Sequence, residues 1–254
     1  MGKDKYLLSS VYNTLEILDL LSEYKELTLS EISKKLNLGK ASVFRMLYTL
    51  EKKQFIHKTQ DAKYRLGVKF AHYGAKVLDR QDNIAVIRPF LEKLRDEHNE
   101  TVHLSVLDAD YNITVIDKAQ NNSAIQMTSR IGGKLPGYCT GMGKVLLAGM
   151  LDDELKEKIF SFDLKKNTDT TITDPNELIE ELNKIRQQGY AEDLEESEVG
   201  LVCYAAPIKN IDGNVTAAIS FSGPALRMQQ NREELISAIK KAAEEISEKI
   251  GYIS

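Results

Sequence analysis

Residues 28–66 carry the pattern that most constrains the fold: two short amphipathic helices that meet at a glycine, followed by a hairpin. Thr28 and Glu31 have the spacing of a capping box, in which each side chain accepts a hydrogen bond from the other residue's amide. Gly39 supplies the bend, and the second helix starts with Lys40. This order is typical of a helix-turn-helix, whose second helix enters the major groove of DNA.

Apolar side chains give each helix one buried face. They recur at positions 29, 32 and 36 in the first helix and at 43, 47 and 50 in the second, which is helical spacing. The other face of the second helix starts with a lysine and carries polar and aromatic side chains. The residues that we expect to contact DNA are Thr28, Lys40, Ala41, Ser42, Phe44, Arg45, Tyr48, Lys58, Lys63 and Arg65.

Two short strands are expected at 55–58 and 63–66, with a turn at Gln60-Asp61, and they correspond to the wing of a winged helix. Residues 34–69 hold ten basic and two acidic side chains in a chain whose net charge is −4. A basic region in an acidic chain favours contact with phosphate. The alternative is a solvated basic surface on an interaction domain.

A length of 254 residues favours two domains. The first 80 residues hold 15 basic and 9 acidic side chains, and the remainder holds 19 and 29. This asymmetry predicts a DNA-binding N-terminal part and an acidic C-terminal part. A first helix is expected at 10–22, packing behind the other two, and a helical linker at 68–80. The stripe predicted to pack in the first helix is Val11, Leu15, Leu18 and Leu21.

The C-terminal part, from residue 82, is predicted to be α+β with a mostly antiparallel sheet. Strands are expected at 102–106, 112–117, 125–130, 190–195, 201–208 and 215–221. Helices are expected at 82–99, 141–150, 152–160, 175–188 and 233–250. The alternation in the first strand predicts that it is half-buried. Asp212-Gly213 indicates a hairpin between the last two strands.

A second motif, GGKLPGYCTGMGKVLLAGM, covers residues 132–150. Glycines at 141 and 143 stand where an apolar helix begins, so backbone amides there could bind an anion. The spacing does not fit a P-loop, because five residues separate Gly137 from Gly143 and Val145 follows the lysine. The alternative is a tight helix start without a ligand. On the last hairpin, residues 201 and 203 share one face of their strand, and residues 220 and 222 share one face of theirs. Whether the two pairs face the same side depends on the register, which the sequence leaves open.

Catalysis and metal binding find little support. The two cysteines, Cys139 and Cys203, could pair only weakly with His103 as a nucleophile–base or metal site, and no zinc-protease or nucleophile-elbow motif is present. We therefore expect no catalytic residue, no metal and no cofactor. Few cysteines and no long apolar run predict a reducing, cytoplasmic compartment without membrane insertion.

Four stretches in the same order resemble the IclR family of bacterial transcription regulators. They are the helix-turn-helix, the GxxLPxxxTGxGKxLLA pattern, GLVCYAAPI and AAISFSGP. The resemblance covers nearly the whole chain. It implies a winged helix-turn-helix at 1–67, a linker helix at 68–81 and a GAF-like α/β effector-binding domain at 82–254. It also implies homodimers or dimers of dimers, a homotetramer, with a small organic acid as effector.

Carried over to this chain, the family's pocket would use Ala124 and Met127 as apolar wall and amides of Gly141 and Met142. Asp193, Leu201, Cys203, Ser220 and Ser222 would complete it. Met142 stands where family members often have alanine, and Ala41 replaces the first hydroxyl of the recognition helix. The resemblance implies a regulator of a near-palindromic double-stranded operator, a repressor rather than an activator, controlled by a small carboxylate. The alternative is a DNA-binding protein whose C-terminal part only dimerises or binds a partner.

Overall fold

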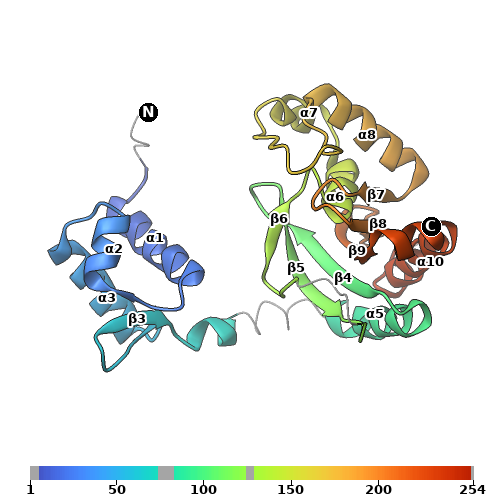
Figure 1. The fold of residues 1–254 in the computed structure, drawn as a ribbon. Helices are drawn as coiled ribbons and strands as arrows, with labels where there is room; N and C mark the ends of the chain where they lie inside the picture. The colour runs from blue at the N-terminus through green and yellow to red at the C-terminus, as the bar shows by residue number, and fades with distance from the viewer. Residues whose placement is uncertain (1–5, 74–82, 124–128, 253–254) are drawn as a thin grey trace. The chain divides into compact units, whose positions relative to one another are not determined.

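The computed structural model describes residues 6–73, 83–123 and 129–252. The chain divides into two compact units, Met1–Gln81 and Asp82–Ser254, which we call the head and the body (Figure 1). Within the described residues, no helix combines the length and the apolar character needed to cross a bilayer.

The head is a winged helix-turn-helix. Its elements are α1 (Ser9–Glu23), β1 (Leu27–Thr28), α2 (Leu29–Lys35), α3 (Lys40–Lys52), β2 (Ile56–Lys58) and β3 (Lys63–Leu66). The strands form an antiparallel sheet in the order β1-β3-β2, with β2 and β3 as the wing. The sequence does not predict β1, because a strand of two residues shows no alternation.

The capping box at the start of α2 is confirmed. The hydroxyl of Thr28 accepts from the amide of Glu31 at 3.3 Å, and the Glu31 carboxylate accepts from the amide of Thr28 at 2.7 Å. Ile32, Val43 and Leu47 are fully buried in the core of the head.

The predicted packing stripe of α1 is only partly correct. Val11 and Leu15 are 51% and 54% exposed, whereas Ile17 and Leu21 are buried against the other helices. Because α1 carries apolar side chains on more than one face, periodicity alone does not decide which face packs.

Only the start of the predicted linker helix can be described. Residues 69–73 are helical, and the ring of Phe70 lies 5.3 Å from that of Phe55, between ring centroids. Residues 74–81 lie outside the described residues.

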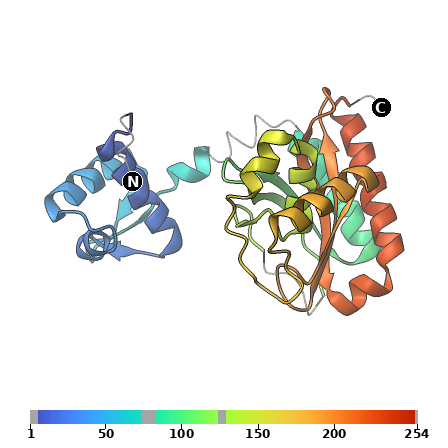
Figure 2. The same cartoon turned by 90° about the horizontal axis from the view of Figure 1, so that it is seen from above.

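The body contains one curled antiparallel sheet with strand order β6-β5-β4-β9-β8-β7. Its strands are β4 (Thr101–Leu107), β5 (Asn112–Ala119), β6 (Lys134–Pro136), β7 (Ala191–Leu194), β8 (Leu201–Lys209) and β9 (Val215–Pro224). Its helices are α5 (Asn83–His98), α6 (Gly141–Met150), α7 (Asp153–Ile159), α8 (Pro175–Gln188), α9 (Ala225–Gln230) and α10 (Arg232–Lys249). Helices α5 and α10 cover one face of the sheet, and α6 and α8 lie on the other (Figures 1 and 2).

Strand β4 departs from the prediction of a half-buried strand. His103 and Ser105 are 1% and 0% exposed, although they alternate with the apolar residues Val102 and Leu104. The central position of β4 explains this difference. One face packs on α5, and the other lies under the layer that contains α6.

Two further elements differ from expectation. Residues 124–128 of the predicted strand 125–130 lie outside the described residues, and residues 129 and 130 are not in a strand. Strand β5 pairs with β4 on one side and with β6 on the other. The short helix α9 is not predicted at all. The hairpin between β8 and β9 is confirmed, with Gly213 in the left-handed region at φ 81°.

Candidate functional site

The recognition helix α3 presents the residues that the sequence singles out. Val43, Leu47 and Leu50 form its buried face. The predicted DNA contacts of the helix are all exposed: Lys40, Ala41, Ser42, Phe44, Arg45 and Tyr48. The rings of Phe44 and Tyr48 stack with centroids 6.3 Å apart, so the exposed face offers a flat apolar surface beside Arg45.

The basic side chains of the wing differ in whether they form an ion pair. Lys63 donates to Glu26 at 2.8 Å, and this bond raises the pKa of the lysine and lowers that of the glutamate. Lys58 and Arg65 are exposed and form no ion pair with the described residues. Thr28 is half-buried, and its hydroxyl is already engaged by Glu31.

The positive charge of the head is largely uncompensated. Of the ten basic residues between 34 and 69, Lys63 alone forms an ion pair with a described carboxylate. Such a surface attracts phosphate, and its attraction falls as salt rises.

The body contains a cavity between the sheet and the start of α6. All seven predicted effector residues that the structure describes line it: Gly141, Met142, Asp193, Leu201, Cys203, Ser220 and Ser222. Ala124 and Met127 lie outside the described residues. The cavity volume is about 20 Å³, close to that of a single bound water. A larger ligand therefore needs the walls to move apart.

The first turn of α6 forms one wall. The hydroxyl of Thr140 accepts from the amide of Gly143 at 3.3 Å and donates to the carbonyl of Pro136 at 2.9 Å. Only the amides of Gly141 and Met142 remain as donors in this turn, since neither bonds to a described residue. The amide of Gly143, which the motif also suggested for anion binding, is not free.

Gly143 is required for packing. A Cβ on this residue would lie 2.2 Å from the carbonyl oxygen of Gly137, so the two backbones meet with no space between them. The glycines of the motif therefore fix the start of α6 against the preceding loop.

The hairpin of β8 and β9 forms the opposite wall. Its register places Cys203 opposite Ser222 and Ala205 opposite Ser220, so the residues whose register was open do share the cavity. The hydroxyl of Ser220 is buried and has no partner among the described residues. Burial and the nearby Asp193 raise the pKa of the Cys203 thiol, which is therefore a weak nucleophile.

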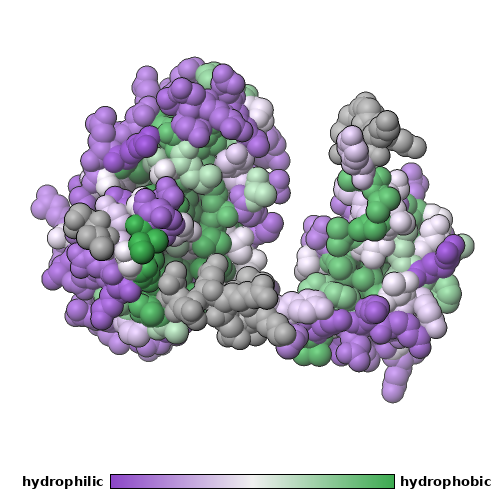
Figure 3. Space-filling view, turned by 180° about the vertical axis from the view of Figure 1, so that it is seen from behind, coloured by the Kyte–Doolittle hydropathy of each residue, from purple (hydrophilic) through white to green (hydrophobic). Residues whose placement is uncertain are grey.

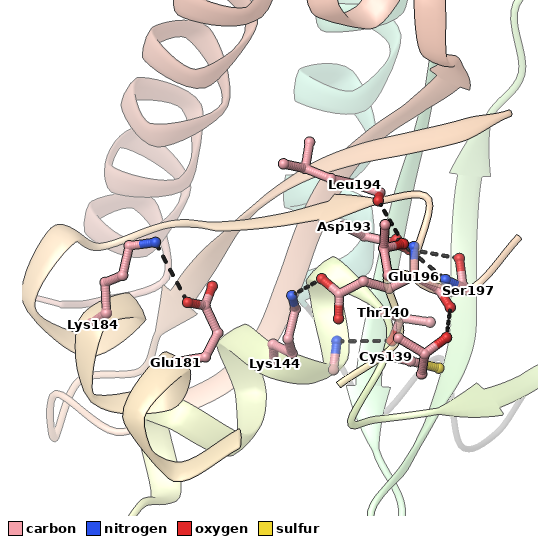
Figure 4. Close-up of polar contacts among 12 residues, drawn as sticks. Cys139, Thr140, Lys144, Glu181, Lys184, Asp193, Leu194, Glu196 and Ser197 are labelled. Atoms are coloured by element: carbon pink, nitrogen blue, oxygen red, sulfur yellow. Dashed lines mark hydrogen bonds and ion pairs between the residues drawn. The ribbon is translucent and has the colours of Figure 1, made fainter. Parts of the chain in front are cut away.

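Asp193 at the end of β7 is bound by its own loop. Its carboxylate accepts from the hydroxyl of Ser197 at 2.6 Å and from the amide of Glu196 at 2.8 Å (Figure 4). The pKa of Asp193 is raised because the group is buried, and these hydrogen bonds oppose the rise. Asp193 thereby shapes the cavity wall rather than offering a free carboxylate.

A buried ion pair supports this loop. Lys144 of α6 is 1% exposed and binds Glu196, which is 6% exposed (Figure 4). Burial raises the pKa of Glu196 to about 7, against the opposing effect of Lys144. The carbonyl of Glu196 also accepts from the hydroxyl of Thr171 at 2.7 Å. The pair joins the start of α6 to the loop that follows β7.

Several residues that line the cavity are not in the predicted effector-binding set. Those with polar side chains are His103, Ser129, Thr140 and Ser197. A lysine inside the apolar run of α6 is a detectable signal, because a buried ammonium needs a buried partner. His103 gives a weaker signal, since its strand looks half-solvated in the sequence.

Neither cysteine supports catalysis. The thiol of Cys139 is buried, and burial raises its pKa to about 12. The described residues contain no cluster of three histidine, cysteine, aspartate or glutamate side chains that could hold a metal ion.

Family models match both units. Residues 75–248 match the model for the bacterial transcriptional regulator IclR C-terminal domain, and residues 10–60 match the IclR helix-turn-helix domain. The chain is 36% identical over 246 residues to the HTH-type transcriptional regulator KdgR of Escherichia coli. That match covers 96% of this chain and 93% of the relative.

Solved structures give the same result. The crystal structure of IclR from Thermotoga maritima matches with a TM-score of 0.75 and 36% identity, covering 96% of this chain and 99% of that one. An IclR homolog from Microbacterium hydrocarbonoxydans, complexed with 4-hydroxybenzoate, matches in fold with a TM-score of 0.81 and 23% identity. The match covers 95% of this chain and 98% of that one.

Proposed function

This chain belongs to the IclR family of bacterial transcriptional regulators, and from that premise we propose that it is an operator-binding repressor controlled by a small organic acid. Members of such a family regulate transcription, in agreement with the expectation that the chain is not an enzyme. The proposal places it in the cytoplasm, where the operator DNA lies.

The cavity of the body is the observation that supports a small organic acid as the effector. It combines the amides of Gly141 and Met142 at a helix N-terminus with the unpaired, buried hydroxyl of Ser220. A helix N-terminus favours an anion. We place the carboxylate of the effector at these amides and its other polar groups near Ser220 and Ser222. Leu201, Cys203 and Asp193 line the same cavity. The family resemblance adds Ala124 and Met127, which lie outside the described residues.

The small cavity suggests how binding becomes a signal. An effector larger than a water molecule binds only when α6, or the loop held by the Lys144–Glu196 pair, moves outward. The acid then has a higher affinity for the expanded body, which is the condition for shifting a conformational equilibrium. The 4-hydroxybenzoate held by a protein of the same fold is an acid of this general kind.

The head supplies the DNA contacts in this proposal. Helix α3 enters the major groove with Ser42 and Arg45 towards base edges, and Lys58 and Arg65 of the wing contact phosphates. A homodimer, or a dimer of dimers, places two heads on a near-palindromic duplex. Repression is the simpler outcome, because a protein that occupies a promoter excludes the polymerase without contacting it.

The test uses the full chain and an operator selected from a pool of random duplexes. Fluorescence anisotropy gives the affinity for that operator with and without millimolar lactate, pyruvate, propionate, benzoate and 4-hydroxybenzoate. We expect at least one acid to change the affinity and to raise the unfolding temperature. Ser220→Ala should weaken the binding of that acid about tenfold. Ser237→Ala, at an exposed position of α10, should leave the affinity for the acid unchanged. If no acid changes either quantity, the body is a dimerisation or partner-binding module instead.

A further inference from the structure

Two buried polar atoms of the cavity wall lack a hydrogen-bond partner among the described residues. They are Nδ1 of His103 and Oγ of Ser220, whose residues are 1% and 0% exposed. The two residues are directly opposite each other on β4 and β9. In such antiparallel pairs the Cβ atoms are about 4.5–5.5 Å apart. Unpaired buried polar atoms are uncommon, and two neighbours in one cavity point to a shared ligand atom.

The other nitrogen of His103 is already held. Nε2 lies 2.5 Å from the hydroxyl of Ser129, and the carbonyl of Ser129 accepts from Lys118 Nζ at 2.5 Å. Lys118 is the neighbour of His103 on β5. These contacts fix the ring through Nε2 and leave Nδ1 for the cavity.

The chemistry of this pair differs from that of the α6 amides. Burial and the nearby Lys118 lower the pKa of His103 to about 4, so the ring is neutral at neutral pH. A neutral imidazole nitrogen and a hydroxyl can each donate or accept, depending on tautomer and rotamer. Such a pair suits an uncharged oxygen, whereas the amides at the N-terminus of α6 suit an anion.

We propose that His103 Nδ1 and Ser220 Oγ together bind a hydroxyl or carbonyl oxygen of the effector. The body then prefers organic acids that carry such an oxygen over acids with a carboxylate alone. This inference rests on the proposed effector function, and it adds His103 as a residue that determines specificity. An acid without the oxygen would seal both atoms away from water with no partner, which is the usual basis of strong discrimination.

The first experiment measures selectivity in the full chain. Isothermal titration calorimetry compares lactate and pyruvate with propionate, and 4-hydroxybenzoate with benzoate. We expect the oxygen-bearing acid of at least one set to bind about 10- to 100-fold more tightly. Equal affinities within both sets would overturn the inference and leave the proposed function intact. If none of the five acids binds, the proposed function fails as well.

A matched pair of variants then separates ligand contact from structural support. His103→Asn keeps a polar atom near the Nδ1 position and loses the bond to Ser129. His103→Gln keeps a polar atom near the Nε2 position and loses Nδ1. Contact through Nδ1 predicts that the asparagine variant retains the selectivity ratio and that the glutamine variant loses most of it. The opposite order would show that His103 serves only to hold Ser129.

Ser220→Ala provides the measurement if both His103 variants fail to fold. It should reduce the same selectivity ratio about tenfold. Circular dichroism and acid-free DNA binding identify a folding failure. An unaltered ratio in Ser220→Ala would also contradict the proposed site.

Discussion

Lys144 illustrates how one buried charge can hold a cavity wall in place. It lies in an apolar helix, yet its ammonium binds Glu196 in the loop that also contains Ser197. Removing one member of such a pair leaves the other buried without compensation, which is costly.

At about pH 8.5, above the pKa of Glu196, Lys144→Met should therefore lower the free energy of unfolding of the body by about 3–5 kcal/mol. Urea unfolding measures the loss. Lys156→Met is the matched control, because the Lys156–Asp153 pair is exposed and should contribute less than about 1 kcal/mol. The Lys144→Met/Glu196→Gln double variant should recover part of the loss. Equal stabilities of Lys144→Met and wild type would show that the buried pair is energetically neutral.

His103 gives the body a predictable response to acid. Its pKa is lowered to about 4 in the folded state, against 6.5 in the unfolded chain. Between these values the unfolded chain binds a proton that the folded chain does not. The stability contributed by the neutral ring is therefore complete above pH 6.5 and is lost as the pH falls towards 4.

The titration of His103 alone should lower the free energy of unfolding by about 2 kcal/mol between pH 7.5 and pH 5. Urea unfolding of wild type and His103→Asn at both pH values isolates it, because all other groups titrate in both proteins. The variant should show the smaller loss. If the two proteins lose the same stability, the ring is protonated in the folded state at pH 5.

Individual residues of the cavity can be proposed from the sequence where a short motif contains them. Gly141, Cys203 and Ser220 come from short motifs, and the fold brings them to one cavity. The role of Gly143 could not be predicted, because its close contact with Gly137 depends on the path of the loop between them. The pairing of Lys144 with Glu196 joins residues 52 positions apart and depends on tertiary structure.

At the scale of elements, the wing is the clearest place to separate kinds of DNA contact. Lys58 is exposed and forms no ion pair with a described residue, whereas Lys63 is held by Glu26. A lysine that contacts a phosphate releases about one counterion when it binds.

Lys58→Ala should weaken binding to all sequences and reduce the salt dependence by about one unit. Lys63→Ala should have a smaller effect, since Glu26 already balances its charge. Anisotropy titrations between roughly 50 and 300 mM salt measure both slopes. Equal slopes for the two variants would mean that Lys63 leaves Glu26 when DNA binds.

Arg45 on α3 tests the recognition helix itself. If it reaches a base edge, Arg45→Ala should cost about 1–3 kcal/mol and relax the preference at one base pair. Affinities for all single-base variants of the selected operator provide the measurement. A uniform loss across these variants would assign Arg45 to the phosphate backbone.

The elements themselves follow largely from local pattern. The capping box, the periodicity of α3 and the Asp212-Gly213 turn lie close together in sequence, and the corresponding elements are confirmed. The burial of β4 on both faces, the pairing of β6 with β5 and the packed face of α1 are set by distant parts of the chain. Local periodicity contains no information about them.

At the scale of the whole molecule, we propose that the exposed apolar side chains of α1 pack against a second copy of the chain. Val11 and Leu15 of α1 are about half exposed. The space-filling view shows hydrophobic area on the surface of the head (Figure 3). A second head packed there would bury this area, and the two recognition helices would read half-sites roughly 34 Å apart.

Leu15→Glu should therefore weaken self-association and, with it, operator affinity. Sedimentation velocity of the full chain measures the first, and anisotropy measures the second. Leu226→Glu, at a 71% exposed leucine of the body, is the control and should leave the association state unchanged. A monomeric wild type with full operator affinity would refute the dimer.

The close packing of Gly137 against the carbonyl of Tyr111, and of Gly143 against Gly137, also limits how the gene can change. Every missense mutation of either codon adds at least a methyl group where backbone atoms already lie 2.2–2.3 Å from the new position. His103 and Ser220, in contrast, already carry side chains that line the cavity. Under the proposed function, new effector preferences should therefore arise by substitution of the sheet residues, whereas variants at the two glycines should be lost from a saturation library.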